Sequence, residues 1–520
     1  MNRMLISAAH KSSGKTVVSI GICAALKMRG LAVQPFKKGP DYIDPMWLSQ
    51  ASGRACRNLD LYLMEREDVV STFVKNSSDI NLVEGNKGLY DGLALDGSNS
   101  NAALAKLLDL PVVLVIDARG MTRGIAPLIL GYQAFDKEIN IAGVILNNLG
   151  GTRRETKLRA VIEHYTDVAV IGAIQHDERL AIVERHLGLM PSNEAGEASS
   201  RIAGIAAAVE SQVDLGKLLA LSTKPPLAAP AKAEVTSFPW REKVRIGIAR
   251  DRAFGFYYAD DLDALAAAGA EIIPFDTLND TRLPEVDALY IGGGFPETCA
   301  KELEANASLR AEIKNAVVSG MPVYAECGGL LYLSRKITYQ GRSYYMVGAI
   351  PGDVLMHDKP IGRGYVHLAE NQQHPWPRPA SLSEKLPPIQ LSPAHPQEVG
   401  RGCKADKSAT TTHSGRKDKR EVGQAGILSQ DKNSQNQPLI FAHEFHYSSL
   451  ENLPPDTEFA YRVTRGHGIN GKHDGLVLHN LLASYTHLRT IGSCYWAARF
   501  VAFIRHVKDG EEPLPRQAAL

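Results

Sequence analysis

The sequence predicts an α/β protein made of two doubly wound domains with mostly parallel sheets. Short runs of Val, Ile and Leu without polar alternation recur in both halves of the chain. Such runs are typical of strands that helices cover on both faces. Helical patterns fill the intervals between the runs, which indicates stacked βα units. The length of 520 residues fits this prediction, since domains contain about 100 to 200 residues each.

Composition and charge limit the function classes. Apolar residues make up 44% of the chain and charged residues 22%, which excludes a wholly disordered or fibrous protein. The net charge of +1 creates no general attraction for nucleic acid or anionic membranes, and we expect neither as a partner. The chain shows no signal-peptide pattern, no long apolar span and no CxxC spacing among its six cysteines. We therefore expect a reduced, cytoplasmic compartment, and the sequence leaves a homodimer open.

The first domain is expected over residues 1–220. A helix is predicted over 15–30, and strands are predicted over 4–8, 31–36, 81–85, 111–117, 141–147 and 168–174. Residues 221–242 combine Pro, Ala and small polar residues without helical or strand periodicity. This composition predicts a linker between domains.

The second domain is expected over residues 243–510. Its predicted strands are 244–250, 271–275, 288–294 and 322–327, with helices over 258–269 and 298–319. Residues 373–438 differ from the rest, because they are Pro-rich and then polar and basic with few apolar residues. Such a segment cannot bury enough surface to offset its ordering entropy, so we expect a disordered insertion there.

A phosphate loop is the first candidate site. The first predicted strand ends in AAHKSSGKT, and a helix follows. In this context backbone N–H groups and the helix N-terminus can cradle phosphates. Gly14, Lys15 and Thr16 are the predicted ATP contacts, with the Lys15 ammonium reaching the phosphates and the Thr16 hydroxyl reaching Mg²⁺. The loop is a variant, since Ala9 stands at the usual first Gly.

Acidic residues follow the next strands at the same edge of the predicted sheet. Asp41 and Asp44 come after the second strand, and Glu84 and Asp91 come after the third. Ligands of open α/β sheets bind at the carboxyl ends of strands, so these carboxylates should converge on the phosphate loop. Glu84 is the expected second contact of Mg²⁺. The alternative is that Asp41, Asp44 and Asp91 cap turns.

A nucleophile elbow is predicted in the second half. Cys327 lies in the segment YAECGG, where a strand passes into a helix among small residues. Such an elbow exposes a nucleophile, and the adjoining helix N-terminus favours a thiolate. Gly293 and Gly294 belong to a glycine loop that can supply N–H groups to an oxyanion hole.

The cysteine needs a base, and two segments offer histidine. One is HEFHY, with His443 and His446, and the other is SYTHL, with His487. Because partners of this kind meet in space rather than in sequence order, the pattern by itself does not choose between the two segments.

Together these residues resemble the cobyrinic acid a,c-diamide synthase family over nearly the whole chain outside the insertion. The segments that carry the resemblance are QPFKKGPDYIDP, EGNKGLYDG, ERHLGL, GGGFPE, YAECGGLLYL, HEFHYS and DGLVLHNLLASYTHL. The resemblance implies an ATP-binding amide synthetase domain, P-loop NTPase-like and similar to dethiobiotin synthetase. A flavodoxin-like class I glutamine amidotransferase domain would follow it. In such enzymes ammonia from glutamine attacks a carboxylate that ATP has activated as an acyl phosphate.

The resemblance also implies roles for individual residues. Cys327 would be the glutaminase nucleophile, and His487 would raise its nucleophilicity. His446 would then be structural or face the substrate. The family shows no obvious third acid, and none is assigned. The residues that resemble synthetase-site contacts are Lys15, Thr16, Asp41, Asp44, Glu84 and Asp91.

The implied activity is amidation of the a- and c-acetate carboxylates of a tetrapyrrole acid, cobyrinate or hydrogenobyrinate, with ATP and Mg²⁺. Two departures keep other substrates open. The family usually has apolar residues where Asn86 and Lys87 stand, and the insertion at 373–438 is unusual. The first alternative is the same chemistry on sirohaem or nickel-sirohydrochlorin. The second is cobyric acid synthase, which amidates other side chains.

A partitioning-type P-loop ATPase is the alternative from another class. It would also carry a variant phosphate loop, but no cysteine elbow would follow it. Such ATPases usually place a Lys five positions before the catalytic Lys, and His10 stands there in this chain.

Overall fold

Seven parallel strands form the sheet of the first domain. Their order is β3-β2-β4-β1-β5-β6-β7, with β1 in the middle. The computed structural model describes residues 1–182, 184–185, 188–193, 197–230, 242–377, 439–491 and 494–510. The strands are β1 Asn2–Ala8, β2 Val33–Lys38, β3 Arg57–Leu59, β4 Ile80–Glu84, β5 Val112–Asp117, β6 Ile141–Leu149 and β7 Ala169–Gln175. The six strands predicted for this half are confirmed. We did not predict β3, because its three residues contain no apolar run.

Helices cover both faces of this sheet, as the apolar strands require. They are α1 Lys15–Met28, α2 Ile43–Ser52, α3 Arg66–Asn76, α4 Asn101–Leu107, α5 Ile125–Phe135, α6 Thr152–Tyr165, α7 Ala198–Gln212 and α8 Leu215–Ser222. Met4 and Ile6 of β1 pack in one core with α1, α2, α7 and α8, whereas Leu5 packs in another with α3 to α6. This alternation follows from the two-residue period of a strand.

A nine-stranded sheet organises the second domain. Its order is β12-β10-β13-β15-β24-β23-β22-β19-β20. The strands are β10 Val244–Ala249, β12 Ala270–Phe275, β13 Ala288–Ile291, β15 Val323–Glu326, β19 Gly362–Glu370, β20 Leu439–His446, β22 Glu458–Arg465, β23 His473–Leu478 and β24 Leu481–Ser484. The part from β12 to β24 is parallel, and the part from β24 to β20 is antiparallel. From the sequence we predicted four strands of the parallel part, β10, β12, β13 and β15, but not β24.

Smaller elements complete the second domain. The helices are α9 Ala259–Ala267, α10 Ala300–Ala305, α11 Ala307–Val318, α12 Gly328–Leu333 and α14 Trp496–Lys508. A second sheet contains β16 Lys336–Tyr339, β17 Arg342–Tyr345, β18 Asp353–Met356 and β21 Ser448–Glu451, and a short pair contains β11 Phe254–Phe256 and β14 Gly293–Gly294. The α/β fold class is therefore confirmed. Within the described ranges, no helix has the length and apolar content to cross a bilayer.

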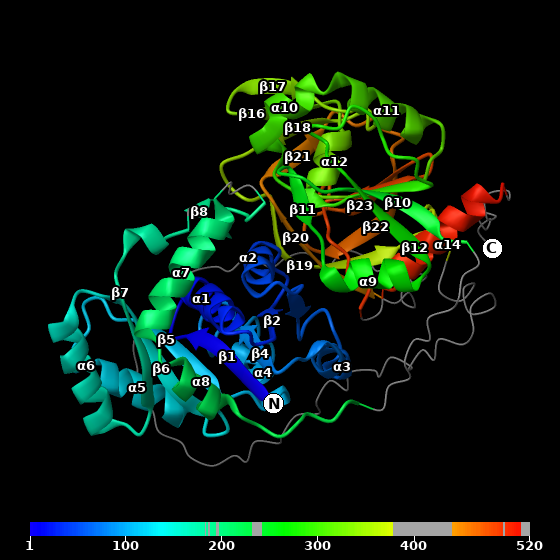
Figure 1. Ribbon diagram of the computed structural model, residues 1–520. Coiled ribbons are helices and arrows are strands. Elements are labelled where there is room, and N and C mark those ends of the chain that lie inside the picture. Colours follow the sequence, from blue (N-terminus) through cyan, green and yellow to red (C-terminus); the bar gives the residue numbers. More distant parts are fainter. Residues whose placement is uncertain are drawn as a thin grey trace, which may run out of the picture.

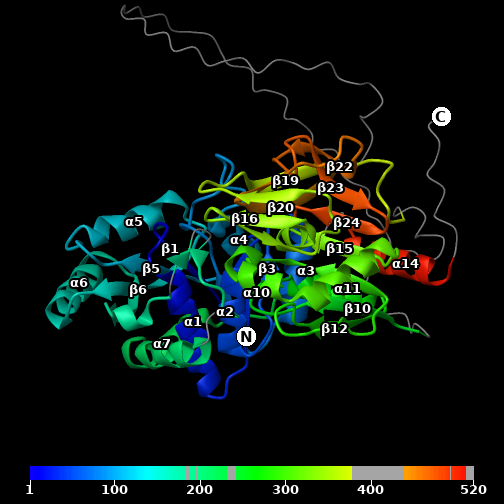
Figure 2. The ribbon, with the colours of Figure 1, turned by 90° about the horizontal axis from the view of Figure 1, so that it is seen from above.

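The two domains lie side by side, with α2 at their junction (Figure 1). Helices α5 and α6 lie at the end of the molecule away from the second domain in both views (Figure 1, Figure 2). Phe256, Tyr258 and Phe295 of the second domain belong to the same apolar cluster as α1, α2 and α7. The domain interface is therefore continuous with a core.

Two segments that we predicted as irregular begin with residues that pack on the neighbouring domain. The first residues of the predicted linker 221–242 pack on the first domain, since Thr223 bridges to Asn2 and Lys224 pairs with Asp109. The start of the predicted insertion 373–438 also packs, because Trp376 is buried beside α14. Burial of this large indole outweighs the polar composition around it. Residues 231–241 and 378–438 lie outside the described residues.

Candidate active site

The phosphate loop joins the end of β1 to the start of α1. Gly14 has a left-handed backbone with φ of 87°, and a Cβ there would lie 2.1 Å from Nδ2 of Asn147. Asn147, on β6, donates from Nδ2 to the carbonyl oxygen of Ser13 at 3.0 Å. Glycine is therefore required at this position. Lys15 is buried at the start of α1, and burial and the charge of Lys37 lower its pKa.

Lys37 lies at the centre of the acidic side chains beside this loop. Its Nζ is 2.5 Å from Asp44, 3.2 Å from Glu84 and 3.7 Å from Asp41. Burial lowers the pKa of Lys37, but the three carboxylates outweigh burial and hold this pKa well above its ordinary value. Lys37 therefore remains charged and balances the carboxylates. We predicted the acids from sequence but not Lys37, although its position at the end of β2 was a usable signal.

Thr16 and Glu84, the predicted metal contacts, lie together. Thr16 Oγ1 donates to Glu84 Oε1 at 2.6 Å and lies 3.3 Å from Asp44 Oδ2. The other oxygen of Glu84, Oε2, is buried and has no hydrogen-bond partner among the described residues. Mg²⁺ is usually bound by one or two carboxylates together with water and substrate phosphates, so this set of oxygens fits Mg²⁺ that arrives with ATP. In the described ranges, no group of three or more His, Cys, Asp or Glu side chains could hold a metal alone.

Asp41 and Asp91 cap turns, as the alternative in the sequence analysis allowed. Asp41 Oδ1 accepts from the N–H groups of Ile43 and Asp44 at 2.9 and 3.2 Å. Asp91 Oδ2 accepts from the N–H of Gly88 at 2.8 Å. Asp41 also lies near Lys37, whereas Asp91 is exposed on the loop after β4. Asp41 therefore caps a turn and also lies beside Lys37, and its role toward a substrate stays a prediction.

The predicted elbow is present at Cys327, between β15 and α12. Cys327 has φ of 46° and ψ of −102°, a strained conformation for a residue with a side chain. Two glycines allow the helix to approach the strand ends so closely. A Cβ at Gly329 would lie 2.1 Å from the carbonyl oxygen of Ile291, and a Cβ at Gly328 would lie 2.9 Å from the backbone nitrogen of Gly294. The ECGG sequence thus follows from the packing of the elbow.

His487 is the histidine that the fold brings to Cys327. It is buried, and its imidazole interacts with the Cys327 thiol and with Glu326, whose Oε2 lies 3.3 Å from Nδ1. Burial lowers the pKa of His487, but the hydrogen bonds with Cys327 and Glu326 outweigh burial and raise this pKa to about 10. Between the two candidate segments, the geometry therefore favours SYTHL.

Glu326 is a residue that the sequence analysis did not assign. Its carboxylate is fully buried, and Oε1 accepts from Tyr324 Oη at 2.5 Å and from the N–H of Leu488 at 3.0 Å. Oε2 accepts from Tyr290 Oη at 3.1 Å. These donors fix the carboxylate opposite Nδ1 of His487, in the position of an orienting acid. Its only sequence signal was its place directly before the cysteine.

The other histidines have different surroundings. His443 stacks on His487 with ring centroids 5.0 Å apart, and burial lowers its pKa well below the ordinary value. His446 stacks on Tyr485 at 3.8 Å and lies 3.7 Å from Glu444. Neither arrangement places a carboxylate and a thiol on opposite sides of the ring, as at His487.

Gly293 and Gly294, the predicted oxyanion donors, form β14 beside the elbow. A Cβ at Gly293 would lie 2.7 Å from Cε1 of His487. Gly294 approaches the start of α12, as the distance from Gly328 shows. Both residues therefore lie next to the cysteine and histidine, and their role as donors stays a prediction.

Comparison with known proteins agrees with this geometry. Residues 245–377 match a CobB/CobQ-like glutamine amidotransferase domain, and residues 2–182 match an AAA domain. The chain is 40% identical to a cobyrinate a,c-diamide synthase of Magnetococcus marinus, over 98% of this chain and 99% of the relative. The chain belongs to the cobyrinate a,c-diamide synthase family. A synthase of that name in Methanosarcina acetivorans is also 40% identical, over 94% of this chain and 92% of its own, and one in Archaeoglobus fulgidus is 35% identical over 96% of each chain.

Membership in the cobyrinate a,c-diamide synthase family makes the chain a glutamine-dependent amidating ligase with an ATP-binding domain. Such a ligase must bring its two domains together, and ion pairs cross the interface here. Arg57 contacts Asp260 at 3.1 Å and Asp263 at 2.6 Å. Arg489 reaches back to Asp260 at 3.0 Å and to the carbonyl oxygen of Asn58 at 3.3 Å. These contacts join β3 to α9 and to the segment that follows His487.

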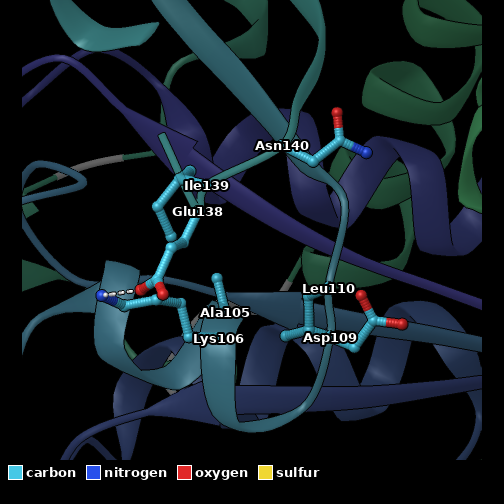
Figure 3. Close-up of a pocket in the computed structure, with 7 residues that line it drawn as sticks. All are labelled: Ala105, Lys106, Asp109, Leu110, Glu138, Ile139 and Asn140. Carbon is cyan, nitrogen blue, oxygen red and sulfur yellow. Dashed lines mark hydrogen bonds and ion pairs between the residues drawn. The ribbon is translucent and has the colours of Figure 1, made fainter. Parts of the chain in front are cut away.

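A depression of about 250 Å³ lies elsewhere, at the amino ends of β5 and β6 (Figure 3). Lys106 pairs there with Asp136 and Glu138, and Asp109 pairs with Arg3 and Lys224. Its charges are balanced by neighbours, and ligands of such sheets bind at the opposite, carboxyl edge. We therefore assign no function to this depression.

Proposed function

We propose that this protein uses ATP and glutamine to amidate the a- and c-acetate carboxylates of a tetrapyrrole acid, cobyrinate or hydrogenobyrinate. The observation that carries the proposal is the presence, in one chain, of a phosphate loop with an acidic cluster and a Cys327–His487–Glu326 elbow. Similarity to synthases of this name along almost their whole length supports the choice of substrate class.

The glutaminase half reaction uses the elbow. Cys327 attacks the amide carbon of glutamine as a thiolate, while His487 holds the proton that the leaving ammonia takes up. Glu326 keeps the imidazole oriented and favours its charged form. The backbone N–H groups of Gly293 and Gly294 face the oxygen of the tetrahedral intermediate. Water then cleaves the thioester, which releases glutamate and restores the thiol.

The synthetase half reaction uses the cluster beside the phosphate loop. Gly14, Lys15 and Thr16 bind ATP, and a substrate carboxylate oxygen takes the γ-phosphoryl group to form an acyl phosphate and ADP. Ammonia then attacks the acyl carbon, and phosphate leaves with the C–O bond electrons. Thr16 and Glu84 would hold Mg²⁺, which would supply positive charge to neutralise the phosphates. Asp41, Asp44 and Asp91 orient the substrate as hydrogen-bond acceptors, since like charges cannot attract a polycarboxylate.

The test uses Cys327 to separate glutamine hydrolysis from amidation. Cys327→Ala should abolish amidation driven by glutamine and leave amidation driven by ammonium chloride within about twofold, because the synthetase site is untouched. Product formation is followed by mass spectrometry. Cys494→Ala is the matched control, since burial raises the pKa of this thiol to about 12 and keeps it protonated. Loss of the ammonium-driven reaction in folded Cys327→Ala would refute the proposal.

Substrate choice rests on the loop after β4. Lys87 is exposed there. Burial lowers the pKa of Lys38 to about 8, and the nearby charge of Lys87 contributes to this shift. Asn86 offers a hydrogen-bond donor and the exposed Lys87 a cation that suit an acidic macrocycle, and sirohaem and nickel-sirohydrochlorin remain the alternatives to cobyrinate. Replacing Asn86 and Lys87 by Leu should change the ranking of these three acids in a competition assay. An unchanged ranking would place the specificity in the segment from His443 to Tyr447.

We also place the enzyme in the cytoplasm, with small-molecule substrates and with neither nucleic acid nor membrane as a partner. A homodimer is part of this proposal, and sedimentation at several concentrations tests it.

A further inference from the structure

Tyr42 belongs to the first domain, but its side chain lies beside His487 and His443 of the second domain. It precedes α2, and its ring is buried. Its ring centroid lies 5.1 Å from that of His487 and 5.7 Å from that of His443. Phe256 stacks on it at 5.4 Å with nearly parallel planes, and Tyr258 lies at 4.4 Å. All four of these rings belong to the second domain, so Tyr42 sits in an aromatic box that the glutaminase domain supplies.

The same residue belongs to the turn that bears the acids. Tyr42 lies between Asp41 and Asp44, and Asp41 Oδ1 binds the N–H groups of Ile43 and Asp44. Lys37 contacts both carboxylates. These bonds make the segment from Asp41 to Asp44 one rigid unit. A rearrangement at the acids must therefore move the ring of Tyr42 against His487.

We propose that Tyr42 is the gate between the two sites and the positioning residue through which occupancy of the ATP site controls glutamine hydrolysis. The inference rests on the proposed function. Ammonia released beside His487 meets the ring of Tyr42 before it reaches Asp44 and Glu84, the residues of the phosphate-transfer site. The ring packs on the His487 imidazole at an angle of 49° and separates it from the acids. Binding of ATP and of the acid at the cluster shifts the turn and opens the gate, as lids and loops do in other enzymes.

The alternative is that Tyr42 only fills space in the interface. The two interpretations differ in the ratio of glutamine hydrolysed to amide formed, because a packing residue affects both reactions together. The variants are Tyr42→Ala, which removes the ring, Tyr42→Leu, which keeps an apolar side chain of intermediate size without a flat ring, and Tyr42→Phe, which keeps the ring. Each is assayed with glutamine and with ammonium chloride, in the presence and absence of ATP and tetrapyrrole acid.

The gate predicts that Tyr42→Ala and Tyr42→Leu hydrolyse about fivefold or more glutamine per amide than the wild type and lose the stimulation of hydrolysis by ATP and acid. Tyr42→Phe should keep both properties within about twofold of the wild type. A wild-type ratio in both ring-less variants would overturn the proposal. An equal loss of glutamine-driven and ammonium-driven amidation at an unchanged ratio would also overturn it, by assigning Tyr42 to the synthetase site. If the wild-type protein amidates no tetrapyrrole acid with ammonium, the proposed function fails instead, and ATP-stimulated glutamine hydrolysis still tests the gate.

Discussion

At the scale of single residues, the carboxylate of Glu326, which directly precedes Cys327 in sequence, acts on His487, a histidine far away in the chain. Glu326 and His487 are separated by 161 positions, yet the carboxylate and Nδ1 lie 3.3 Å apart. Because the carboxylate is buried and fixed by two tyrosines, its charge acts on the imidazole without solvent screening. The acidity of His487 is therefore set by its neighbours in space.

Glu326→Gln should move the alkaline limit of glutaminase activity to lower pH. The negative charge of Glu326 raises the pKa of His487, so its removal lowers this pKa, and the imidazole loses its proton at lower pH. Each unit of this fall corresponds to about 1.4 kcal/mol of lost interaction with the charged ring. The measurement is kcat/KM for glutamine between pH 6 and pH 11, a range of about five units around the ordinary and raised values.

Glu444→Gln is the control for this experiment, since Glu444 is also buried and pairs with His446. We expect it to leave the alkaline limit in place. If Glu444→Gln moves the limit and Glu326→Gln does not, His446 rather than His487 is the base.

At the scale of elements, the elbow at Cys327 is formed by a few consecutive residues. Strand β15 and helix α12 are joined at one strained residue, and the glycines after Cys327 let the helix start against the end of β13. A sequence pattern can show this, because the constraint lies within a few consecutive residues. Strand β3 and the antiparallel half of the second sheet are different, since their short or mixed sequences form strands only through pairing with neighbours.

Gly329→Ala should destabilise the protein by about 1–3 kcal/mol, because the added methyl group would meet a backbone carbonyl that cannot move aside. Glutaminase activity should fall with it, as the elbow is displaced. Gly204→Ala in helix α7 is the matched control, because no atom lies within 4 Å of a Cβ at that position. This control should stabilise by up to about 1 kcal/mol. Urea unfolding measures both changes, and equal effects would show that α12 has room to shift.

At the scale of the whole molecule, the relation between the domains rests on aromatic packing and a few ion pairs. Arg57 and Asp260 are largely buried, with side-chain exposures of 13% and 9%. Asp260 is shared with Arg489, so the charges form a small network across the interface. Networks of this kind contribute more than isolated surface pairs, because less of their interaction is screened by water.

A double-mutant cycle of Arg57→Met and Asp260→Asn should give a coupling of about 1–2 kcal/mol. Arg29 and Glu210 are the control pair, since they lie within one domain with side-chain exposures of 42% and 45%. Their coupling should stay below about 0.5 kcal/mol. Urea unfolding followed by domain-specific fluorescence gives both values. A coupling across the interface no larger than the control would show that apolar packing alone joins the domains.

The sequence by itself determined the α/β class, the strands of the seven-stranded sheet apart from β3, the phosphate loop and the cysteine elbow. Each of these depends on periodicity, glycine conformation or chemistry within a short stretch of chain. Gly14, Lys15, Thr16 and Cys327 could be named for this reason.

Only the tertiary structure decided the partners of these residues. It placed Lys37 among three carboxylates, chose His487 over His443 and His446, added Glu326 behind the imidazole, and set Tyr42 of one domain against the histidine of the other. The physical reason is that the energies involved arise from burial and from charges at contact distance. Folding brings these groups together from positions far apart in the chain, and a local sequence pattern does not show which distant groups will meet.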